Sequence, residues 1–138
     1  MNLATRIKIS GLSGALAVAL GALGAHYLKS LVSAGELSQD ALNSFETATR
    51  YHLAHSLAML LASLPVWPQN NKQVIWAFRL FLVGIILFSG SIYLLSLRHI
   101  LHADWLRVLG PVTPIGGICL ISAWIAVAFS FAKKNQDA

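Results

Sequence analysis

Apolar residues gather in four stretches of the chain, and polar residues gather between these stretches. The apolar stretches cover about residues 9–28, 45–64, 74–97 and 111–132. A helix of about 20 apolar residues crosses the roughly 30 Å hydrocarbon core of a bilayer, and each stretch has that length. The pattern therefore predicts an all-α fold, an integral membrane four-helix bundle, with residues 1–138 forming a single transmembrane domain.

The composition supports this prediction and limits the kinds of partner that the protein can bind. Hydrophobic residues make up 57% of the chain and charged residues only 11%, whereas soluble domains carry about 25% charged residues. The basic residues are scattered singly around the apolar stretches, which is typical of topology control and not of a phosphate-binding patch. We therefore expect the lipid bilayer as a partner and no nucleic acid. The lone Cys119 excludes an internal disulfide.

The distribution of basic residues predicts the orientation of the bundle. Four spans place both termini on one side of the membrane, together with the second connection. The basic residues on that side are Arg6, Lys8, Lys72, Arg79, Lys133 and Lys134. Those on the opposite side are Lys29, Arg98 and Arg107. Because cytoplasmic segments carry the excess of Lys and Arg, we expect both termini in the cytoplasm.

The first span has the basic start of a secretory signal peptide, but its apolar run of about 20 residues exceeds the usual 7–15 residues. Ala17, Gly21 and Ala25 recur every fourth residue, a spacing that lets helices approach closely in lipid. We expect this span to be retained as a packed helix and not cleaved.

Helix signals mark the segments between the spans. Ser38 followed by Asp40 is typical of an N-cap with an acid in the first turn, and the helical pattern then runs on to Leu64. Pro65 and its neighbours end that helix. The alternation of apolar and charged residues in 98–110 predicts a short helix at the membrane interface.

The second span carries an unusual concentration of ionisable residues. Such groups are expensive at membrane depth and mark candidate functional sites. Glu46 and Arg50 share one helix face at the favourable i,i+4 spacing, which predicts a structural ion pair. Tyr51, His52 and His55 cluster on the opposite face.

The histidines of this cluster have three interpretations. His52 and His55 are hydrogen-bonded packing residues, or they bind a metal together with His26 at a compatible depth on the first helix, or they line a proton path or a pocket for a small molecule. No nucleophile–base–acid triad, glycine-rich phosphate loop or pair of carboxylates is found in the sequence. We therefore assign no catalytic residue and no cofactor.

Four motifs, taken together, resemble a known family. They are GALGAHYLKS (21–30), FETATRYHLAHSLAMLL (45–61), LFSGSIYLLSL (87–97) and GPVTPIGGICLISAW (110–124). In this order they are similar to the YgdD/YwdK-like family of small four-helix bacterial inner-membrane proteins, a DUF423-type family without an established activity. The resemblance implies four transmembrane helices and a multi-pass location in the bacterial inner membrane.

The resemblance also implies which residues belong to the shared pattern. It includes His26, Tyr51 and His55, whereas His52 departs from it because family members tend to carry an amide there. We therefore expect the site to consist of His26 and His55, which would meet between the first two helices. If a pair of histidines binds a metal, we expect it to be this pair and not His52 with His55. The expected helix-packing notches are Gly21, Ser89, Gly90, Ser91, Thr113, Pro114, Gly116 and Gly117.

The leading functional expectation is a structural, accessory or interaction component of the membrane without catalysis. The alternative is a small carrier or binding protein for a proton, a metal or an apolar molecule. It would use an intramembrane polar cluster of His26, Glu46, Arg50, Tyr51, His52 and His55. A single bundle of this length leaves little room for a conduit, so transport would require a homo-oligomer. The expected protein partners are further copies of this chain in a homo-oligomer, or other proteins of a larger membrane complex.

Overall fold

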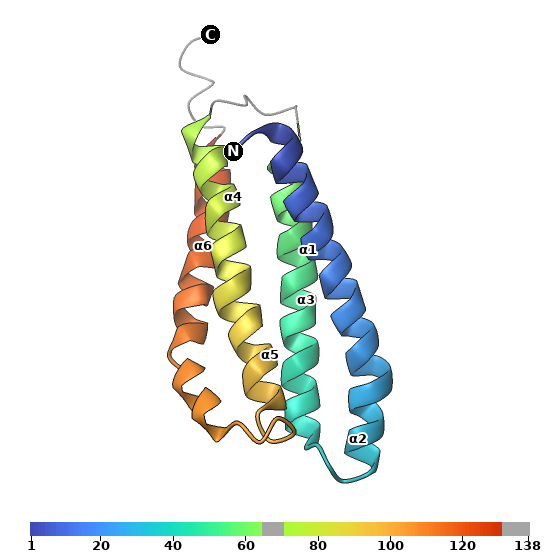
Figure 1. Cartoon of the computed structure of the whole chain (residues 1–138). Helices are drawn as coiled ribbons and strands as arrows, with labels where there is room; N and C mark the ends of the chain where they lie inside the picture. The colour runs from blue at the N-terminus through green and yellow to red at the C-terminus, as the bar shows by residue number, and fades with distance from the viewer. Residues whose placement is uncertain (65–70, 131–138) are drawn as a thin grey trace.

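The computed structural model describes residues 1–64 and 71–130, and within these residues the fold is all-α. Four long helical segments run side by side in an up-and-down order (Figure 1). The elements are α1 (Leu3–Leu23), η1 (Gly24–Leu28), α2 (Lys29–Ser33), α3 (Gln39–Leu61), α4 (Lys72–Gly84), η2 (Ile85–Ser89), α5 (Gly90–Leu97), η3 (Asp104–Leu109) and α6 (Val112–Ser130).

The first helical segment is continuous from α1 through η1 to α2. The Asn2 side chain caps its start by accepting a hydrogen bond from the Thr5 N–H at 2.8 Å. Gly35 ends it with φ of 76°, a left-handed conformation that glycine adopts without steric cost. The Glu36 N–H then donates to the Leu31 carbonyl at 2.9 Å, which satisfies an end carbonyl of the helix.

Helix α3 begins where the sequence predicts and ends slightly earlier. The Ser38 hydroxyl accepts from the Ala41 N–H at 3.2 Å, so the predicted N-cap is confirmed. The helix runs unbroken to Leu61, whereas the sequence predicts an end at Leu64. The prolines at positions 65 and 68 lie outside the described residues.

The other two long segments contain non-α turns that the hydropathy pattern does not reveal. A π-helical turn, η2, joins α4 to α5, in the same way as η1 follows α1. Single π turns occur often at functional sites. The predicted interfacial helix is present as the 3₁₀ segment η3, where Leu106 is buried and Trp105 is exposed. Helix α6 starts at Val112, so Pro114 lies in its first turn, where a missing N–H costs nothing.

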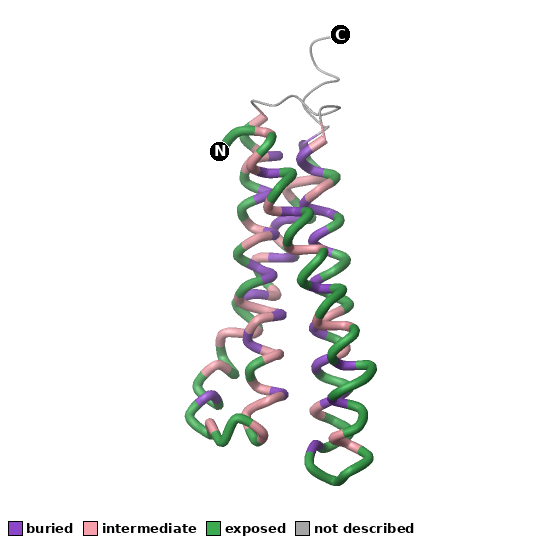
Figure 2. Tube along the Cα trace, turned by 45° about the vertical axis from the view of Figure 1, so that its right-hand side comes forward, coloured by how far each residue is buried: buried purple, intermediate pink, exposed green. Residues whose placement is uncertain are grey.

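The bundle is built from two helix pairs, α1 with α3 and α4 with α6. The pairs meet where α3 contacts α4, η2 and α5, while α1 and α4 stay apart (Figures 1 and 2). Buried residues face the interior and exposed residues cover the outer faces (Figure 2). One apolar cluster consists of Ala58, Met59, Ala77, Phe78, Phe81, Ile85, Leu120 and Ala123. A second, at the α2 end, consists of Leu28, Leu37, Leu42 and Phe45.

Among the residues that the structure describes, three helical segments are long and apolar enough to cross a membrane: Leu3–Ser33, Lys72–Leu97 and Asp104–Ser130. Helix α3 has 23 residues and lies alongside them, but its polar residues lower its hydropathy below theirs. The predicted spans 9–28, 74–97 and 111–130 fall within or beside these segments. Residues 131–132 of the last predicted span lie outside the described residues.

The tightest contact between helices lies where α6 crosses η2. A Cβ placed on Gly116 would overlap the backbone N of Phe88 and come within 2.7 Å of the Leu87 carbonyl carbon. Backbone atoms cannot yield as a flexible side chain does. Gly116 is therefore a true packing notch, as the sequence predicts. The neighbouring Gly117 has more room, because its Cβ would meet the Phe88 ring at an ordinary 3.7 Å.

We predict that Gly116→Ala destabilises the protein by about 1–3 kcal/mol, the usual cost of an overpacked core, because the new methyl group forces α6 away from η2. Thermal unfolding of the purified protein in detergent measures this effect. Gly117→Ala is the matched control and should unfold like the unsubstituted protein. Equal unfolding temperatures for the two variants would contradict the close contact at Gly116.

Candidate functional site

His52 is the residue that connects three helices. It is 4% exposed, and both of its ring nitrogens have partners. Its Nε2 lies 3.1 Å from the Ser13 hydroxyl of α1, and its Nδ1 lies 3.3 Å from the Tyr93 hydroxyl of α5. These partners sit on segments that lie on opposite sides of the groove, so His52 links the two sides of the bundle.

The chain of hydrogen bonds continues through Ser56. The Ser13 hydroxyl lies 2.7 Å from the Ser56 hydroxyl, and Ser56 donates to the His52 carbonyl at 2.8 Å. We call Ser13, His52, Ser56 and Tyr93 the polar floor. Its residues are hydrogen-bonded at a depth where unsatisfied polar groups cost several kcal/mol.

Counting hydrogens fixes the direction of the chain. The four bonds require four hydrogens, and three hydroxyls with one neutral imidazole supply four. Because the Ser56 hydrogen goes to a carbonyl, Ser13 must donate to Ser56. His52 then donates from Nε2 to Ser13, and Tyr93 donates to Nδ1. All hydrogens of the polar floor are used in these bonds. The Tyr93 hydroxyl also shares a side-chain hydrogen bond with Thr49 of α3, so Ser13 and Tyr93 each retain one free lone pair.

The polar floor lies beneath an apolar groove of about 470 Å³. The groove runs between α1 on one side and α4, η2 and α5 on the other, where Figure 1 shows these segments apart. Ser13, His52 and Tyr93 are its polar lining. The remaining lining residues are Ile9, Leu12, Leu16, Leu20, Leu82, Ile85, Ile86 and Gly90.

His55 is fully engaged on a different side of α3. Its Nδ1 donates to the Tyr51 carbonyl at 2.7 Å, and its Nε2 accepts from the Trp124 indole N–H at 3.2 Å. The ring also packs against Phe81, with centroids 5.8 Å apart. His55 therefore joins α3 to α6 as a hydrogen-bonded packing residue, which was one of the interpretations that the sequence left open.

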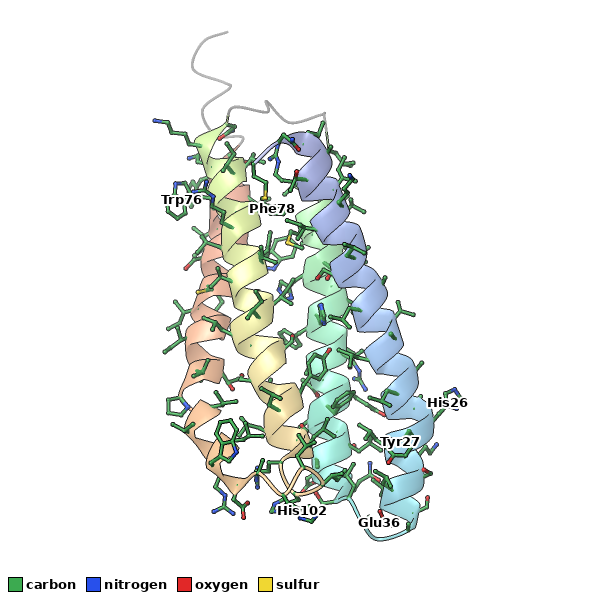
Figure 3. The ribbon with its side chains drawn as sticks, in the orientation of Figure 1. His26, Tyr27, Glu36, Trp76, Phe78 and His102 are labelled. Carbon is green, nitrogen blue, oxygen red and sulfur yellow. The ribbon has the colours of Figure 1, made fainter. Side chains whose placement is uncertain are left out.

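The structure does not bring His26 and His55 together. His26 lies on the π turn η1, is exposed, and points away from the bundle (Figure 3). His55 faces α6 instead. The expectation that the two histidines meet between the first two helices is wrong, because the helix carries His26 on its outer face. Within the described residues, no group of three His, Cys, Asp or Glu side chains could hold a metal ion.

Glu46 and Arg50 form the predicted ion pair, with 3.4 Å between Oε2 and a guanidinium nitrogen. The pair lies on the outer face of α3, where the Arg50 side chain is 78% exposed. It is separate from the polar floor. Tyr51 is also largely outside, stacked on His55 and packed against Phe88 at 4.9 Å. The candidate cluster of the second span thus divides among three faces.

The packing notches have different roles. Ser91 shares a hydrogen bond of 2.7 Å with Thr113, which joins α5 to α6. A Cβ on Gly21 would lie 3.2 Å from the Thr49 methyl group, so Gly21 lets α1 approach α3 closely. Ser89 is buried without a hydrogen-bond partner among the described residues. Gly90 has open space around it, because it faces the groove.

Sequence reasoning missed three of the four residues of the polar floor, Ser13, Ser56 and Tyr93. Each is a polar residue inside an apolar stretch, and that position is the signal that could have found them. It also ranked His52 below His55. An amide, the residue expected at position 52 in the family, has a donor group and an acceptor group, as a neutral imidazole does. The departure at His52 therefore keeps one group of each kind.

Long apolar helices with polar groups satisfied between them define an integral membrane protein of the helical-bundle class. Residues 20–117 match the family described as "Protein of unknown function (DUF423)", and the chain belongs to this family. A UPF0382 membrane protein of Staphylococcus aureus is 39% identical, with 92% of this chain and 94% of the relative covered.

Relatives also occur in distant organisms. A UPF0382 membrane protein of Schizosaccharomyces pombe is 40% identical over 85% of this chain and 92% of its own length. The UPF0382 membrane protein YwdK of Bacillus subtilis is 34% identical over 92% and 95%. No solved structure matches the chain. These relatives establish the predicted family and its membrane character, and they indicate no catalytic function.

We predict that the two buried histidines are opposite tautomers. His52 should carry its hydrogen on Nε2 and His55 on Nδ1, because their partners impose these directions. NMR of the protein with ¹⁵N-labelled histidine distinguishes the two forms, and His52→Gln and His55→Gln variants assign the signals. Two identical tautomers, or a doubly protonated His52 at neutral pH, would contradict the hydrogen count.

We predict that His52→Gln is tolerated, whereas His52→Leu destabilises the protein by about 1–3 kcal/mol. Leucine has no polar atom, so the Ser13 and Tyr93 hydroxyls lose the hydrogen bonds that they form with the imidazole. Chemical unfolding of the purified variants in detergent measures the difference. His26→Leu is the control at an exposed histidine and should have little effect. A His52→Leu protein as stable as His52→Gln would argue against the link between helices.

Proposed function

We propose that this protein is a non-catalytic, multi-pass protein of the bacterial inner membrane that binds an elongated apolar molecule in the groove between α1 and α4–α5. The single observation that carries this proposal is the hydrogen-bonded polar floor beneath an otherwise apolar groove. The side chains that join the helices therefore also line the groove, where their polar groups can meet a bound molecule.

The groove has the size and character of a ligand site. Its volume of about 470 Å³ falls within the roughly 300–1,000 Å³ that is typical of small-molecule pockets. Such sites are mostly apolar and use a few polar groups to fix the ligand's orientation. Ser13, His52 and Tyr93 are placed to do this here.

The depth and direction of the polar floor define the polar part of the ligand. His52 lies about 20 Å along a helix of about 35 Å, so the polar floor is near the middle of the bundle. A charged headgroup is too costly at that depth. The hydrogens of the polar floor are all donated within it, so only lone pairs of Ser13 and Tyr93 are available to a ligand. A neutral hydrogen donor, such as the hydroxyl of a long-chain alcohol, complements it.

The same hydrogen directions support a role without catalysis. A catalytic serine donates its hydrogen to the histidine Nε2, and a carboxylate on the other nitrogen orients the ring. Here Nε2 donates to Ser13, and a tyrosine hydroxyl occupies the other nitrogen. The Ser13–His52 pair is therefore arranged as a hydrogen-bonding surface and not as a nucleophile with its base.

The charge distribution supports an orientation with both termini in the cytoplasm. The start of α1, the start of α4 and the end of α6 lie at the same end of the bundle (Figure 1), and Lys8 of α1 with Lys72 and Arg79 of α4 are exposed. Arg79 lies over the Trp76 ring at 5.6 Å, as expected of a cation–aromatic pair at the membrane surface. The opposite end mixes acidic and basic residues, so the basic excess marks the terminal end as cytoplasmic.

We predict that the protein in lipid nanodiscs binds a radiolabelled long-chain alcohol about tenfold more tightly than the corresponding methyl ether. The ether lacks the hydrogen that the floor accepts, and about 1.4 kcal/mol corresponds to this tenfold factor. Equilibrium dialysis against empty nanodiscs measures the two affinities. Equal binding of alcohol and ether would contradict the proposed direction of the polar floor.

A pair of glycine variants tests the location. Gly90→Leu should abolish binding, because Gly90 lines the groove with free space around it. Gly11→Leu is the matched control, since Gly11 is equally open but lies outside the groove. Loss of binding in both variants, or in neither, would refute this groove as the site. Cross-linking from a cysteine at position 90 to another polypeptide would instead favour a protein partner.

A further inference from the structure

A second hollow lies at the opposite end of the bundle from the chain's termini, between the start of α3, the end of α5 and the start of α6. It has a volume of about 520 Å³ and is lined by polar residues over much of its wall. The lining residues used below are Asp40, Ser44, Ile92, Ser96, Arg98 and Thr113. It shares no lining residue with the groove beneath which His52 lies.

The hollow contains polar groups that the described residues leave unsatisfied. The Ser96 side chain is 94% buried, at 6% exposure, and its hydroxyl has no hydrogen-bond partner. The Arg98 Nε is also buried without a partner, while another guanidinium nitrogen donates to the Leu95 carbonyl at 3.3 Å. A buried polar atom without a partner is destabilising, so a bound group that satisfies both atoms is favoured.

The hollow also carries one negative and one positive side chain, and these two do not pair with each other. Asp40 and Arg98 both line it, yet neither forms an ion pair within the described part of the chain. Arg98 is only half-buried, so its planar guanidinium can meet a phosphate, which it binds with two parallel hydrogen bonds. Asp40 is exposed and can accept hydrogen bonds from an ammonium group.

A narrower hollow of about 280 Å³ continues from this one between α3 and α5. The two share Ser44 and Ile92, and the second adds Asn43 and Thr47. One turn deeper on α3, Tyr51 packs against Phe88. The combined shape is a polar chamber at the end of the bundle with an open, shallow channel between α3 and α5.

We propose that this chamber binds the headgroup of a zwitterionic, amine-bearing phospholipid, with one acyl chain along the channel. The phosphate meets Arg98 and the Ser96 hydroxyl, and the primary ammonium meets Asp40. A phosphate alone would leave Asp40 unpaired beside the anion. A quaternary ammonium has no N–H to donate, and an anionic headgroup without an amine gives Asp40 no partner. The chamber therefore selects phosphatidylethanolamine-type headgroups.

Native mass spectrometry of the delipidated full-length protein tests this proposal by titration with three lipids of matched acyl chains. Phosphatidylethanolamine should bind about tenfold more tightly than phosphatidylglycerol or phosphatidylcholine. Asp40→Asn should remove this preference without weakening phosphatidylglycerol binding, and Arg98→Gln should weaken all three lipids. Ser96→Ala, which adds no bulk, should weaken all three to a smaller extent.

Arg107→Gln is the matched control for a lost arginine on the same side of the membrane. Arg107 pairs with Asp104 at 3.7 Å in η3 and does not line the chamber. Its loss should leave the lipid preference unchanged, and unfolding temperatures verify that each variant is folded. Equal binding of the three lipids to the unsubstituted protein would overturn the proposal. A preference that survives Asp40→Asn, or that Arg107→Gln also removes, would overturn it as well.

Discussion

The hydrogen-bonded chain centred on His52 is the interaction that the arrangement of the bundle depends on. Helices α1 and α5 flank an open groove, and Ser13 and Tyr93 reach the same imidazole from these two sides. In lipid, apolar side chains gain nothing by leaving one apolar surrounding for another, so satisfied polar groups and close packing hold helices together. His52 supplies polar contacts from α3 to α1 and α5 in this association, and His55 adds one to α6.

Close backbone packing supplies the other part, and it acts within the pairs. Gly116 lets α6 lie against the backbone of η2, and Gly21 lets α1 approach Thr49 of α3. Ser91 with Thr113 adds one hydrogen bond between α5 and α6. The hydrogen bond between His55 and Trp124 instead joins α3 to α6 and so adds to the link between the pairs. The pairs are thus tight, while the space between α1 and α4 stays open and lined by apolar residues. This division creates a groove with a polar floor.

The sequence predicted the helices well because apolar length and capping residues are local signals. Ser38, the ion pair of Glu46 with Arg50, and the notch at Gly116 all appear as predicted. The direction in which each histidine side chain points was not predictable in the same way. The π turn that contains His26 changes the register of the helix and has no signature in the sequence. Likewise, the partners of His52 come from other helices, and only the packing of those helices brings Ser13 and Tyr93 to one ring.

A double-mutant cycle between His52 and Tyr93 tests the central claim most directly. The free energy of unfolding would be measured in detergent for His52→Leu, Tyr93→Phe and the double variant. If the hydrogen bond joins the two sides of the bundle, the cycle should give a coupling energy of about 0.5–1.7 kcal/mol, the range of interhelical hydrogen bonds in membrane proteins. Additive effects of the two substitutions would show that His52 and Tyr93 do not hold the helices together.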